Sequence, residues 1–421
     1  MAIEGSGSSL VSPGFSRMRS TRRLAVLLFL AYASLIAVFQ GILNVLLPLV
    51  VARLAPDAKV GTLAFLSTGA AIAAVIALFA GGAVSDRTRS RWGKRTPSLL
   101  IALLASIALM PLVGGATSLL QLTVLLPLLW FTLNYYQSVL LAALPDRIPA
   151  HELSFASAAI GLGAPVGIFA GINIATMAAN IMTGYIFLAI PLTILTFVLI
   201  VLEPEDSSLE EPVKERQNFS WKSCYAQFGS FAHRNYSLAA ISRALLFLCY
   251  FSVTGYIFYL LQDYVGQEQL PYQSINAGMS IFSSVMTAAW LLVTVLTGWL
   301  SGRLPRTVLI VATVSILAGV VTLLPALSNS WIMFLIFGLG TGIMFGSYFV
   351  LDLKLATLVL PDEKTAGRDF GILLAAGSAP GVVAPAVAGA IIAVSGYPAL
   401  FLFGAGVAFI GGLCVAFIRL R

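Results

Sequence analysis

Residues 81–97 read GGAVSDRTRSRWGKRTP and separate two long apolar runs. Part of this charged stretch recurs 216 positions further along the chain, where the copy is shorter and lacks the acidic residue. A similar match joins Leu-Pro-Asp at 144–146 to Leu-Pro-Asp at 360–362. The offset is about half of the 421 residues, which predicts two copies of one unit. The other matched pairs are Gly82 and Gly298, Ser85 and Ser301, Arg87 and Arg303, Ala150 and Ala366, and Gly161 and Gly377.

The composition indicates a membrane protein. Hydrophobic residues make up 59% of the chain and charged residues 10%, whereas a soluble domain carries roughly 25% charged residues. Apolar runs of about 20 residues, the length of a membrane-spanning helix, cover nearly the whole sequence. The net charge of +7 comes from basic residues in short loops between these runs, which is typical of membrane orientation and not of nucleic-acid binding. We therefore expect an all-α membrane protein.

The sequence does not predict a metal site or a cofactor. Cys224, Cys249 and Cys414 are scattered along the chain without metal-ligand or disulfide spacing. No Gly-x-x-x-x-Gly-Lys-Ser/Thr loop for nucleotide phosphates occurs. We expect a monomer in the lipid bilayer that binds a small-molecule substrate, without nucleic acid and without ATP.

Apolar runs bounded by turn and charge signals predict twelve spans in two six-helix bundles. Residues 1–23 form an N-terminal tail and 24–202 the first bundle. Residues 203–235, a long polar stretch, form a linker before the second bundle at 236–421. The expected helices cover 24–51, 60–84, 98–114, 118–142, 153–178, 181–202, 236–262, 275–300, 306–326, 331–357, 367–394 and 398–418.

The basic residues predict the orientation in the membrane, because Lys and Arg resist translocation. With the N-terminus inside, the inner segments hold 21 of the 24 Lys and Arg residues. The outer loops hold Arg53 and Lys59, and Arg243 falls inside a span. We therefore expect both termini and the linker to be cytoplasmic, and the protein to lie in the plasma membrane.

The stretch 81–97 also carries the most specific motif of the chain. Its residues are Gly82, Asp86, Arg87, Arg91, Gly93, Lys94 and Arg95. This pattern resembles the signature loop of the major facilitator superfamily. The form SDRTRSRWGKR is most similar to the glycoside–pentoside–hexuronide sugar symporters and sucrose-carrier relatives of that superfamily, and residues 348–381 resemble the helix 10–11 region of its bacterial members. The resemblance implies two pseudo-symmetric six-helix bundles that rock around a central site.

Physical roles can be assigned to parts of this loop. Gly82 allows close helix approach, and Asp86 ends a span where its charge can meet a neighbouring helix N-terminus. The resemblance implies that the arginines pair with carboxylates of the opposite half as a cytoplasmic gate. A simpler interpretation is that five basic residues obey the orientation rule, but the spacing and the partial repeat favour the motif. Gly302 stands where Asp86 would, so the second copy is expected to form a weaker gate.

The family architecture places a central cavity between helices 1, 4, 7 and 10 of the twelve. Amides and phenols there suit hydroxyl-rich ligands, because they donate and accept hydrogen bonds, and aromatic rings can stack on sugars. Alternatively, such side chains tie helices together through interhelical hydrogen bonds. The candidate substrate-binding residues are Gln40, Asn44, Asn134, Gln137, Tyr250, Thr254, Tyr256, Tyr259 and Tyr348.

Two charges inside the expected spans are candidates for a functional role. Asp352 precedes Pro361 at the inner end by nine residues, about 13 Å along a helix, and an unpaired carboxylate at that depth is costly. It could load a proton for coupling, or pair with Lys354 or with a basic residue on another helix. We expect Arg243 to extend its head to the inner interface; the functional alternative is that it binds an anionic group of the substrate.

Glycines and prolines cluster in the matched helices 153–178 and 367–394. Small residues allow close packing and prolines permit bending. We expect the two clusters to face each other in a moving interface, with ordinary membrane packing as the alternative. The residues are Gly161, Gly163, Pro165, Gly167 and Gly171 in the first helix, and Gly377, Pro380, Gly381, Pro385 and Gly389 in the second.

These features predict a secondary transporter that moves a small organic solute by alternating access, with a sugar or glycoside favoured. Helices 24–51 and 60–84 carry no acidic residue, unlike sodium-coupled sugar symporters, so we expect coupling to a proton or uniport. The alternative is an antiporter that exports drugs or metabolites. A receptor or scaffold would need a binding domain outside the bilayer, and an enzyme a catalytic constellation; the sequence predicts neither.

Overall fold

The computed structural model describes residues 13–149, 152–209, 229–301, 306–362 and 366–419. Regular structure within these ranges is entirely helical, without a strand. The expected tail (1–23) and linker (203–235) lie partly outside the described residues. Helices suit so apolar a chain, because in lipid each backbone N–H and C=O must find its partner within the same segment.

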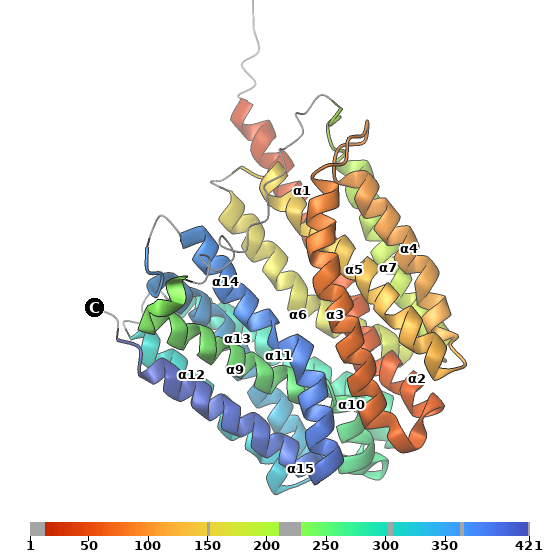
Figure 1. Ribbon diagram of the computed structural model, residues 1–421, viewed down its shortest axis with the longest axis vertical. Coiled ribbons are helices and arrows are strands. Elements are labelled where there is room, and N and C mark those ends of the chain that lie inside the picture. The colour runs from red at the N-terminus through yellow and green to blue at the C-terminus, as the bar shows by residue number, and fades with distance from the viewer. Residues whose placement is uncertain (1–12, 150–151, 210–228, 302–305, 363–365, 420–421) are drawn as a thin grey trace, which may run out of the picture.

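The first half of the chain forms one helical bundle (Figure 1). Its elements are α1 (Pro13–Gly41), η1 (Ile42–Leu46), α2 (Leu47–Leu54), η2 (Pro56–Ala58), α3 (Lys59–Ser85), α4 (Thr96–Gly114), α5 (Leu119–Arg147), α6 (Leu153–Met177) and α7 (Ile181–Leu202). Helix α1 begins at Pro13, inside the expected tail, because the arginines that mark a membrane boundary are themselves good helix formers. The turn η1 is a single π-helical turn, which widens the helix locally.

The second half forms a second bundle. Its elements are η3 (Gly229–Ala232), α9 (Arg234–Thr254), α10 (Ile257–Tyr259), η4 (Leu260–Gly266), η5 (Gln267–Gln269), η6 (Pro271–Gln273), α11 (Ile275–Ser301), α12 (Thr307–Leu327), α13 (Trp331–Leu358), α14 (Ala366–Ser378) and α15 (Pro380–Ala416). The expected helix 236–262 is interrupted, since α9 ends at Thr254 and the chain continues through α10 into the π-helical η4.

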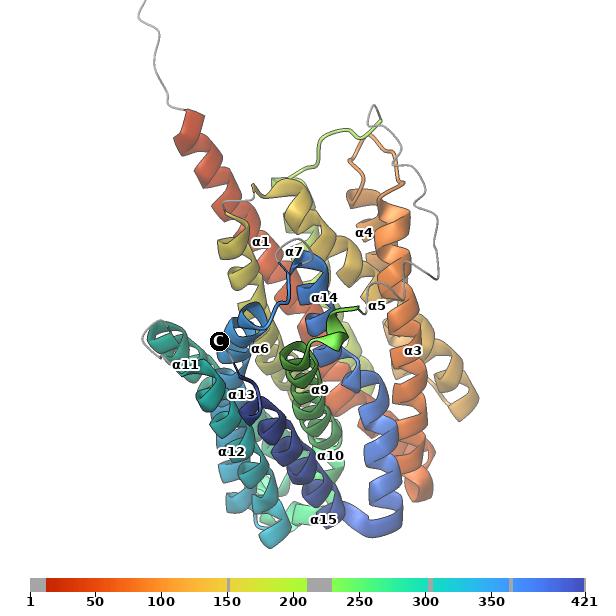
Figure 2. The same ribbon diagram turned by 60° about the vertical axis from the view of Figure 1, so that its left-hand side comes forward.

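Eleven helices of the described chain are long and apolar enough to cross a membrane, whereas the sequence predicts twelve. The last two expected spans share the 48-residue stretch Asp369–Ala416. Within it the chain reverses direction (Figure 2), and Gly396 has a φ of 75° and a ψ of 179° at the kink. A glycine can adopt this conformation without strain. The two arms of α15 are therefore joined at one residue and not by a loop.

The packing of helices repeats between the two halves. In the first bundle α1 packs against α6, α3 against α5, and α4 against α7. The equivalent helices of the second bundle make the same pairs: α9 with α15, α11 with α13, and α12 with α15. Between the bundles, α3 packs against α15 and α6 packs against α11. These two pairs are also equivalent to each other in the two repeats. The bundles are therefore related by a pseudo-twofold axis, as the 216-residue offset predicts.

Buried apolar side chains fill each bundle. One cluster occupies the first bundle and continues across the contact between the bundles to Phe334 and Phe401. A second cluster fills the rest of the second bundle around Phe345 and Tyr348. Large apolar side chains also cover the outside of the molecule, which suits surroundings of lipid.

Candidate functional site

A cavity lies between the two bundles and is lined by residues of both. The space in it that a water-sized sphere can reach is about 100 Å³, below the roughly 300–1,000 Å³ of small-molecule sites. Most of the lining is apolar, and no charged side chain of the described residues belongs to it. Five of the predicted substrate-binding residues line this cavity: Gln40, Asn44, Tyr250, Thr254 and Tyr256.

Three pairs of lining residues occupy equivalent positions in the two repeats. Each pair is separated by the same 216 residues that relate the two copies of the unit. The pairs are Gln40 and Tyr256, Leu63 and Met279, and Ser67 and Ser283. The cavity therefore lies at the pseudo-twofold axis, where the two bundles present corresponding faces to each other.

The amides of Gln40 and Asn44 form a hydrogen-bonded pair on the first bundle. Asn44 lies in the widened turn η1, and its Nδ2 donates to the Gln40 Oε1 at 2.5 Å and to the Gln40 carbonyl at 3.2 Å. Neither the Gln40 Nε2 nor the Asn44 Oδ1 has a hydrogen-bond partner among the described residues. The pair can therefore offer one donor group and one acceptor to a ligand.

The second bundle contributes aromatic rings at the break after α9. The Tyr250 ring packs against Phe345, with ring centres 4.6 Å apart, and against Trp290 at 6.0 Å. The Tyr256 hydroxyl donates to the Pro385 carbonyl at 2.9 Å, and the Thr254 hydroxyl donates within its own helix. The ring contacts of Tyr250 and the hydrogen bond of Tyr256 hold an aromatic wall that lines the same cavity as the amide pair.

The other four predicted substrate-binding residues do not line the cavity. Asn134 donates to the Trp130 carbonyl of its own helix at 2.8 Å, and Gln137 is a hydrogen-bond partner of Tyr32. Tyr259 donates to the Pro48 carbonyl at 3.1 Å, and Tyr348 donates to Asp352.

Sequence reasoning missed two polar residues of the cavity, Ser67 of α3 and Ser283 of α11. The family architecture directed attention to helices 1, 4, 7 and 10, and these serines lie on the second and eighth spans. The repeat held the missing signal, because the two serines are 216 positions apart. A search for polar residues at equivalent positions of the two copies would have found them.

Arg243 and Asp352 form a buried ion pair inside the second bundle. The Arg243 Nη1 donates to the Asp352 Oδ2, and the Tyr348 hydroxyl donates to Oδ1 at 3.0 Å. The guanidinium also lies over the Phe247 ring, 5.6 Å from its centre. Arg243 is 5% exposed, so the expectation that its head reaches the interface is wrong. The carboxylate of Asp352 on a neighbouring helix balances the charge of Arg243, so the guanidinium need not reach water.

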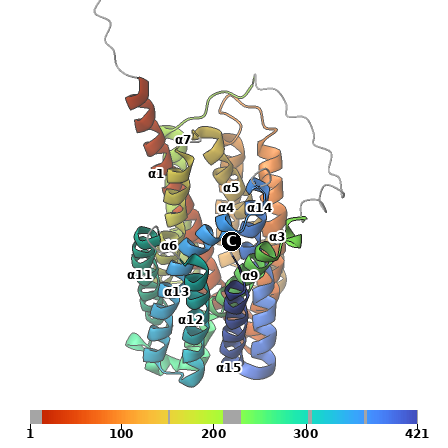
Figure 3. The same cartoon turned by 90° about the vertical axis from the view of Figure 1, so that its left-hand side faces the viewer.

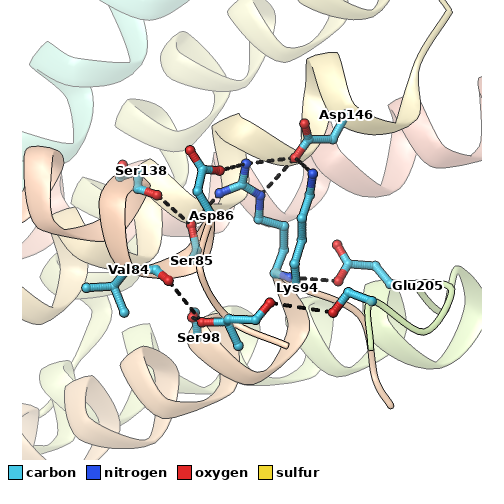
Figure 4. A network of polar contacts seen from close by, with 12 residues as sticks. Val84, Ser85, Asp86, Lys94, Ser98, Ser138, Asp146 and Glu205 are labelled. Carbon is cyan, nitrogen blue, oxygen red and sulfur yellow. Dashed lines mark hydrogen bonds and ion pairs between the residues drawn. The ribbon is translucent and has the colours of Figure 1, made fainter. Parts of the chain in front are cut away.

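The signature loop forms an ionic network within the first bundle (Figure 4). The Arg95 Nη2 lies 2.5 Å from Asp86 and 2.7 Å from Asp146, and Lys94 lies 3.2 Å from the same Asp146 oxygen. Arg87 and Arg91 are exposed and have no carboxylate within 4.0 Å among the described residues. The expected pairing with the opposite half is therefore not what this structure shows, because the partners Asp86 and Asp146 belong to the same bundle.

Two details of the loop differ from the sequence expectation. The close approach is made by Gly81, where a Cβ would lie 2.8 Å from the Tyr135 carbonyl, whereas at Gly82 the nearest atom would be 3.7 Å away. Asp86 meets Arg95 and not a helix N-terminus. The acid at the N-terminus of α4 is Glu205, whose Oε2 accepts from the backbone N–H groups of Arg95 at 2.8 Å and Thr96 at 3.0 Å.

Glu205 is therefore a part of the loop structure that the sequence analysis missed. Its side chain occupies the space beside Gly93, which has a φ of 84°. A side chain at position 93 would be strained by that conformation and would collide with Glu205. The start of the linker is thus packed onto the signature loop.

Polar contacts between the bundles lie at the opposite end from the signature loop. Lys59 of α3 lies 2.6 Å from Asp263 and 3.2 Å from the Gln262 Oε1 of the second bundle. Within the second bundle, Tyr397 donates to the same Asp263 at 2.7 Å. The remaining hydrogen bonds that cross between the bundles in the described residues, Tyr259 to Pro48 and Ser280 to Asn173, lie at the same end. This end of the interface is closed.

The glycine-rich helices do not face each other as expected. Helix α6 packs against α1 and α11, and α15 packs against α9 and α3. The contacts between the bundles are instead the reciprocal pairs α6 with α11 and α3 with α15. Among the described residues, no three His, Cys, Asp or Glu side chains gather into a group that could hold a metal ion.

Comparison with known proteins gives the family. The model of the Major Facilitator Superfamily matches residues 24–351 and 280–421. No curated protein sequence matches the chain.

Solved structures share the fold at low sequence identity. A bacterial homologue of the human lysosomal transporter Spinster, in an inward-facing and unoccupied conformation, is 13% identical, with a TM-score of 0.63 over 97% of this chain and 95% of that one. The nucleoside transporter NupG is 13% identical, with a TM-score of 0.71 over 94% and 99%. The human organic anion transporter MFSD10 is 15% identical, with a TM-score of 0.65 over 94% and 99%. Together with the helical spans and the paired bundles, the family match shows that this chain belongs to the Major Facilitator Superfamily.

Proposed function

We propose that the protein is a secondary transporter that moves a small, uncharged organic solute across the plasma membrane by alternating access, with both termini cytoplasmic. The observation that carries this proposal is the cavity at the pseudo-twofold axis, lined by equivalent residues of the two repeats. A site in that place can be exposed to either side when one bundle rocks against the other.

The lining supports a neutral, hydroxyl-bearing ring compound such as a sugar or glycoside. The amides of Gln40 and Asn44 and the hydroxyls of Ser67 and Ser283 can bind hydroxyl groups, and Tyr250 supplies a flat apolar face. A charged solute would find no opposite charge among the described lining residues. The largely apolar wall also favours the second candidate, export of an amphiphilic drug or metabolite by antiport.

The contacts between the bundles support an inward-facing state in this structure. Their hydrogen bonds and ion pair lie at the end away from the signature loop, and the basic residues place that loop in the cytoplasm. Rocking to the outward-facing state would then break the contacts of Lys59 with Asp263 and Gln262.

Asp352 is the proposed coupling group, with a proton as the coupling ion. Its pair with Arg243 connects to the cavity through aromatic contacts, because Tyr348 bonds Asp352 and packs against Phe345, which packs against Tyr250. Protonation would weaken the ion pair and loosen this wall. Uniport is the alternative within the same function.

The test of the proposed function is counterflow uptake in proteoliposomes with labelled hexoses, glycosides, nucleosides and cationic drugs. We expect a sugar or glycoside to exchange. Replacing Gln40 or Asn44 by Ala should raise KM several-fold, because one lost hydrogen bond is worth about 0.5–1.5 kcal/mol. Gln121→Ala, which removes an amide outside the cavity, is the matched control.

Each outcome of this test separates one of the functions. If the protein exchanged a drug but no sugar, the result would favour export by antiport over sugar transport. If Gln40→Ala and Asn44→Ala both kept the original KM, and Gln121→Ala transported normally, the substrate would not bind in this cavity. No exchange of any solute by folded protein would favour a receptor or scaffold.

A further inference from the structure

A second cavity lies at one end of the second bundle, where α9 and α12 begin and where α13 and α15 end. The C-terminal residues lie beside the start of α9 there (Figure 3). Unlike the central cavity, this one is strongly basic, and no acidic side chain of the described residues lines it. Its basic residues and histidine are His233, Arg234, Arg306, Lys354 and Arg419.

Two helix N-termini open into this cavity. The residues that precede α9 and α12, His233 and Arg306, both line the cavity, and neither side chain caps its helix. The first N–H groups of a helix have no partner within the helix, and they carry partial positive charge. Such groups add to the attraction that the arginines exert on an anion.

The charge balance of this cavity differs from that of the equivalent region in the first bundle. There Glu203 lies 3.3 Å from Arg23 and 3.9 Å from Arg147. Position 203 corresponds to Arg419 in the second repeat, at the offset of 216. Arg234, Arg306 and Arg419 have no carboxylate within 4.0 Å among the described residues. Within the described part of the chain, these three arginines thus lack the carboxylate partner that Glu203 provides in the first bundle.

The cavity has a fixed geometry and an apolar side. The side-chain amide of Asn235 makes two hydrogen bonds to the backbone of Arg419. Its Nδ2 donates to the Arg419 carbonyl at 2.8 Å, and its Oδ1 accepts from the Arg419 N–H at 3.3 Å. Leu309 and Leu358 line the same cavity and are 55% and 48% exposed. Basic groups therefore lie next to apolar side chains that face the surroundings of the helices.

We propose that this cavity binds the anionic headgroup of a membrane phospholipid. Arg234, Arg306 and Arg419 bind the phosphate, and the acyl chains lie along Leu309 and Leu358. A free phosphate would share the headgroup chemistry, but the apolar side has no role for it. Basic pockets between helix ends at the cytoplasmic face are typical sites for anionic lipids. The site is separate from the transport cavity, so it does not depend on the identity of the cargo.

The experiment measures the thermal unfolding midpoint of the purified chain in detergent. The titrants are phosphatidylglycerol, phosphatidylcholine and glycerol phosphate. We expect a saturable rise of the midpoint with phosphatidylglycerol and little change with the other two. In Arg306→Gln/Arg419→Gln the half-saturating concentration of phosphatidylglycerol should rise about tenfold or more, since each basic residue near an anionic lipid contributes to binding.

Two further variants make the result decisive. Arg22→Gln/Arg89→Gln also removes two exposed arginines, away from the cavity, and should bind phosphatidylglycerol as the original chain does. Arg306→Lys/Arg419→Lys keeps both charges and should stay within a few-fold of the original, which guards against misfolding of the glutamine variant. Equal half-saturation in the glutamine variants at both places would overturn the proposal. Glycerol phosphate acting as strongly as phosphatidylglycerol would also overturn it, in favour of a free anion.

Discussion

Among single residues, Arg243 and Asp352 show how a charge can lie inside an apolar bundle. Both are almost completely buried, at 5% and 6% exposure. The carboxylate accepts hydrogen bonds from Arg243 and Tyr348. Gly377 leaves room for the guanidinium, because a Cβ there would lie 2.7 Å from the Arg243 Nε. Removing one partner would leave an uncompensated charge, whereas the pair together tolerates burial.

Asp352→Asn tests the proposed coupling. The amide cannot release a proton, so we expect loss of solute accumulation driven by a pH gradient, while counterflow exchange continues. Uptake into proteoliposomes with and without an imposed gradient measures the difference. Accumulation as strong as in the original chain would remove Asp352 as the coupling group.

Stability provides the control for this variant. Asp352→Asn leaves Arg243 without a counter-charge, which typically costs about 3–5 kcal/mol. The unfolding midpoint of Asp352→Asn should therefore fall, and Arg243→Gln/Asp352→Asn should recover part of the loss. Loss of accumulation together with loss of counterflow in the single variant would indicate damage to the fold and would not support coupling.

At the scale of helices, close packing of α1 and α6 depends on glycine at defined positions. A Cβ on Gly171 would lie 2.6 Å from the Ala37 Cα, and one on Gly167 would lie 2.7 Å from the Ile36 Cβ. On the same helix, a Cβ on Gly161 would meet no atom within 4 Å. Some glycines of α6 thus lie in close contact with α1, whereas at Gly161 there is room for a side chain. The close ones serve packing inside the first bundle.

Gly171→Ala should lower the unfolding midpoint, because the added methyl group forces α1 and α6 apart, at a cost of about 1–3 kcal/mol. Gly161→Ala is the matched control and should be neutral or stabilise by up to about 1 kcal/mol. Thermal unfolding in detergent compares the two. Equal midpoints for both variants would contradict the close packing of α1 on α6.

Across the whole molecule, contacts at one end of the interface hold the bundles together. Lys59 belongs to the first bundle, and its partners Asp263 and Gln262 belong to the second. Its ammonium also lies over the Tyr259 ring, 5.1 Å from the centre. The side chains of Lys59 and Asp263 are 19% and 29% exposed, so water only partly screens the pair.

Lys59→Glu should shift the molecule toward the state in which this end is open, because it places two like charges opposite each other. Spin labels at Asp57→Cys and Glu268→Cys, in a chain without its native cysteines, measure the separation of the bundles. We expect a population at longer distance in Lys59→Glu and its loss in Lys59→Glu/Asp263→Lys. Arg53→Gln removes a charge at the same end that bonds within its own bundle. If Arg53→Gln gave the same spin-label distances as Lys59→Glu, a specific role of the Lys59–Asp263 pair would be ruled out.

The proposed orientation concerns the molecule as a whole. A reporter tag inserted between residues 210 and 228 and another at the C-terminus should both be protected from protease added outside intact cells. A tag at Asp57, at the other end of the bundles, should be cleaved. Emergence of the first two tags on opposite sides of the membrane would contradict a cytoplasmic linker and C-terminus.

The sequence alone determined the repeat, the approximate positions of most helices and the membrane-embedded class. These features depend on runs of neighbouring residues, which a linear pattern records. Lys59 and Ile275, for example, begin α3 and α11 at the same offset of 216 that the loop motif indicates.

Only the tertiary structure decided which polar side chains meet. Ser67 and Ser283 reach one cavity, Arg243 turns toward Asp352 and away from the interface, and Glu205 closes over the signature loop. These outcomes depend on the rotation of each helix about its axis and on the packing of helices distant in the chain. A sequence pattern that is apolar on every face leaves that rotation open, so contacts between helices had to select it.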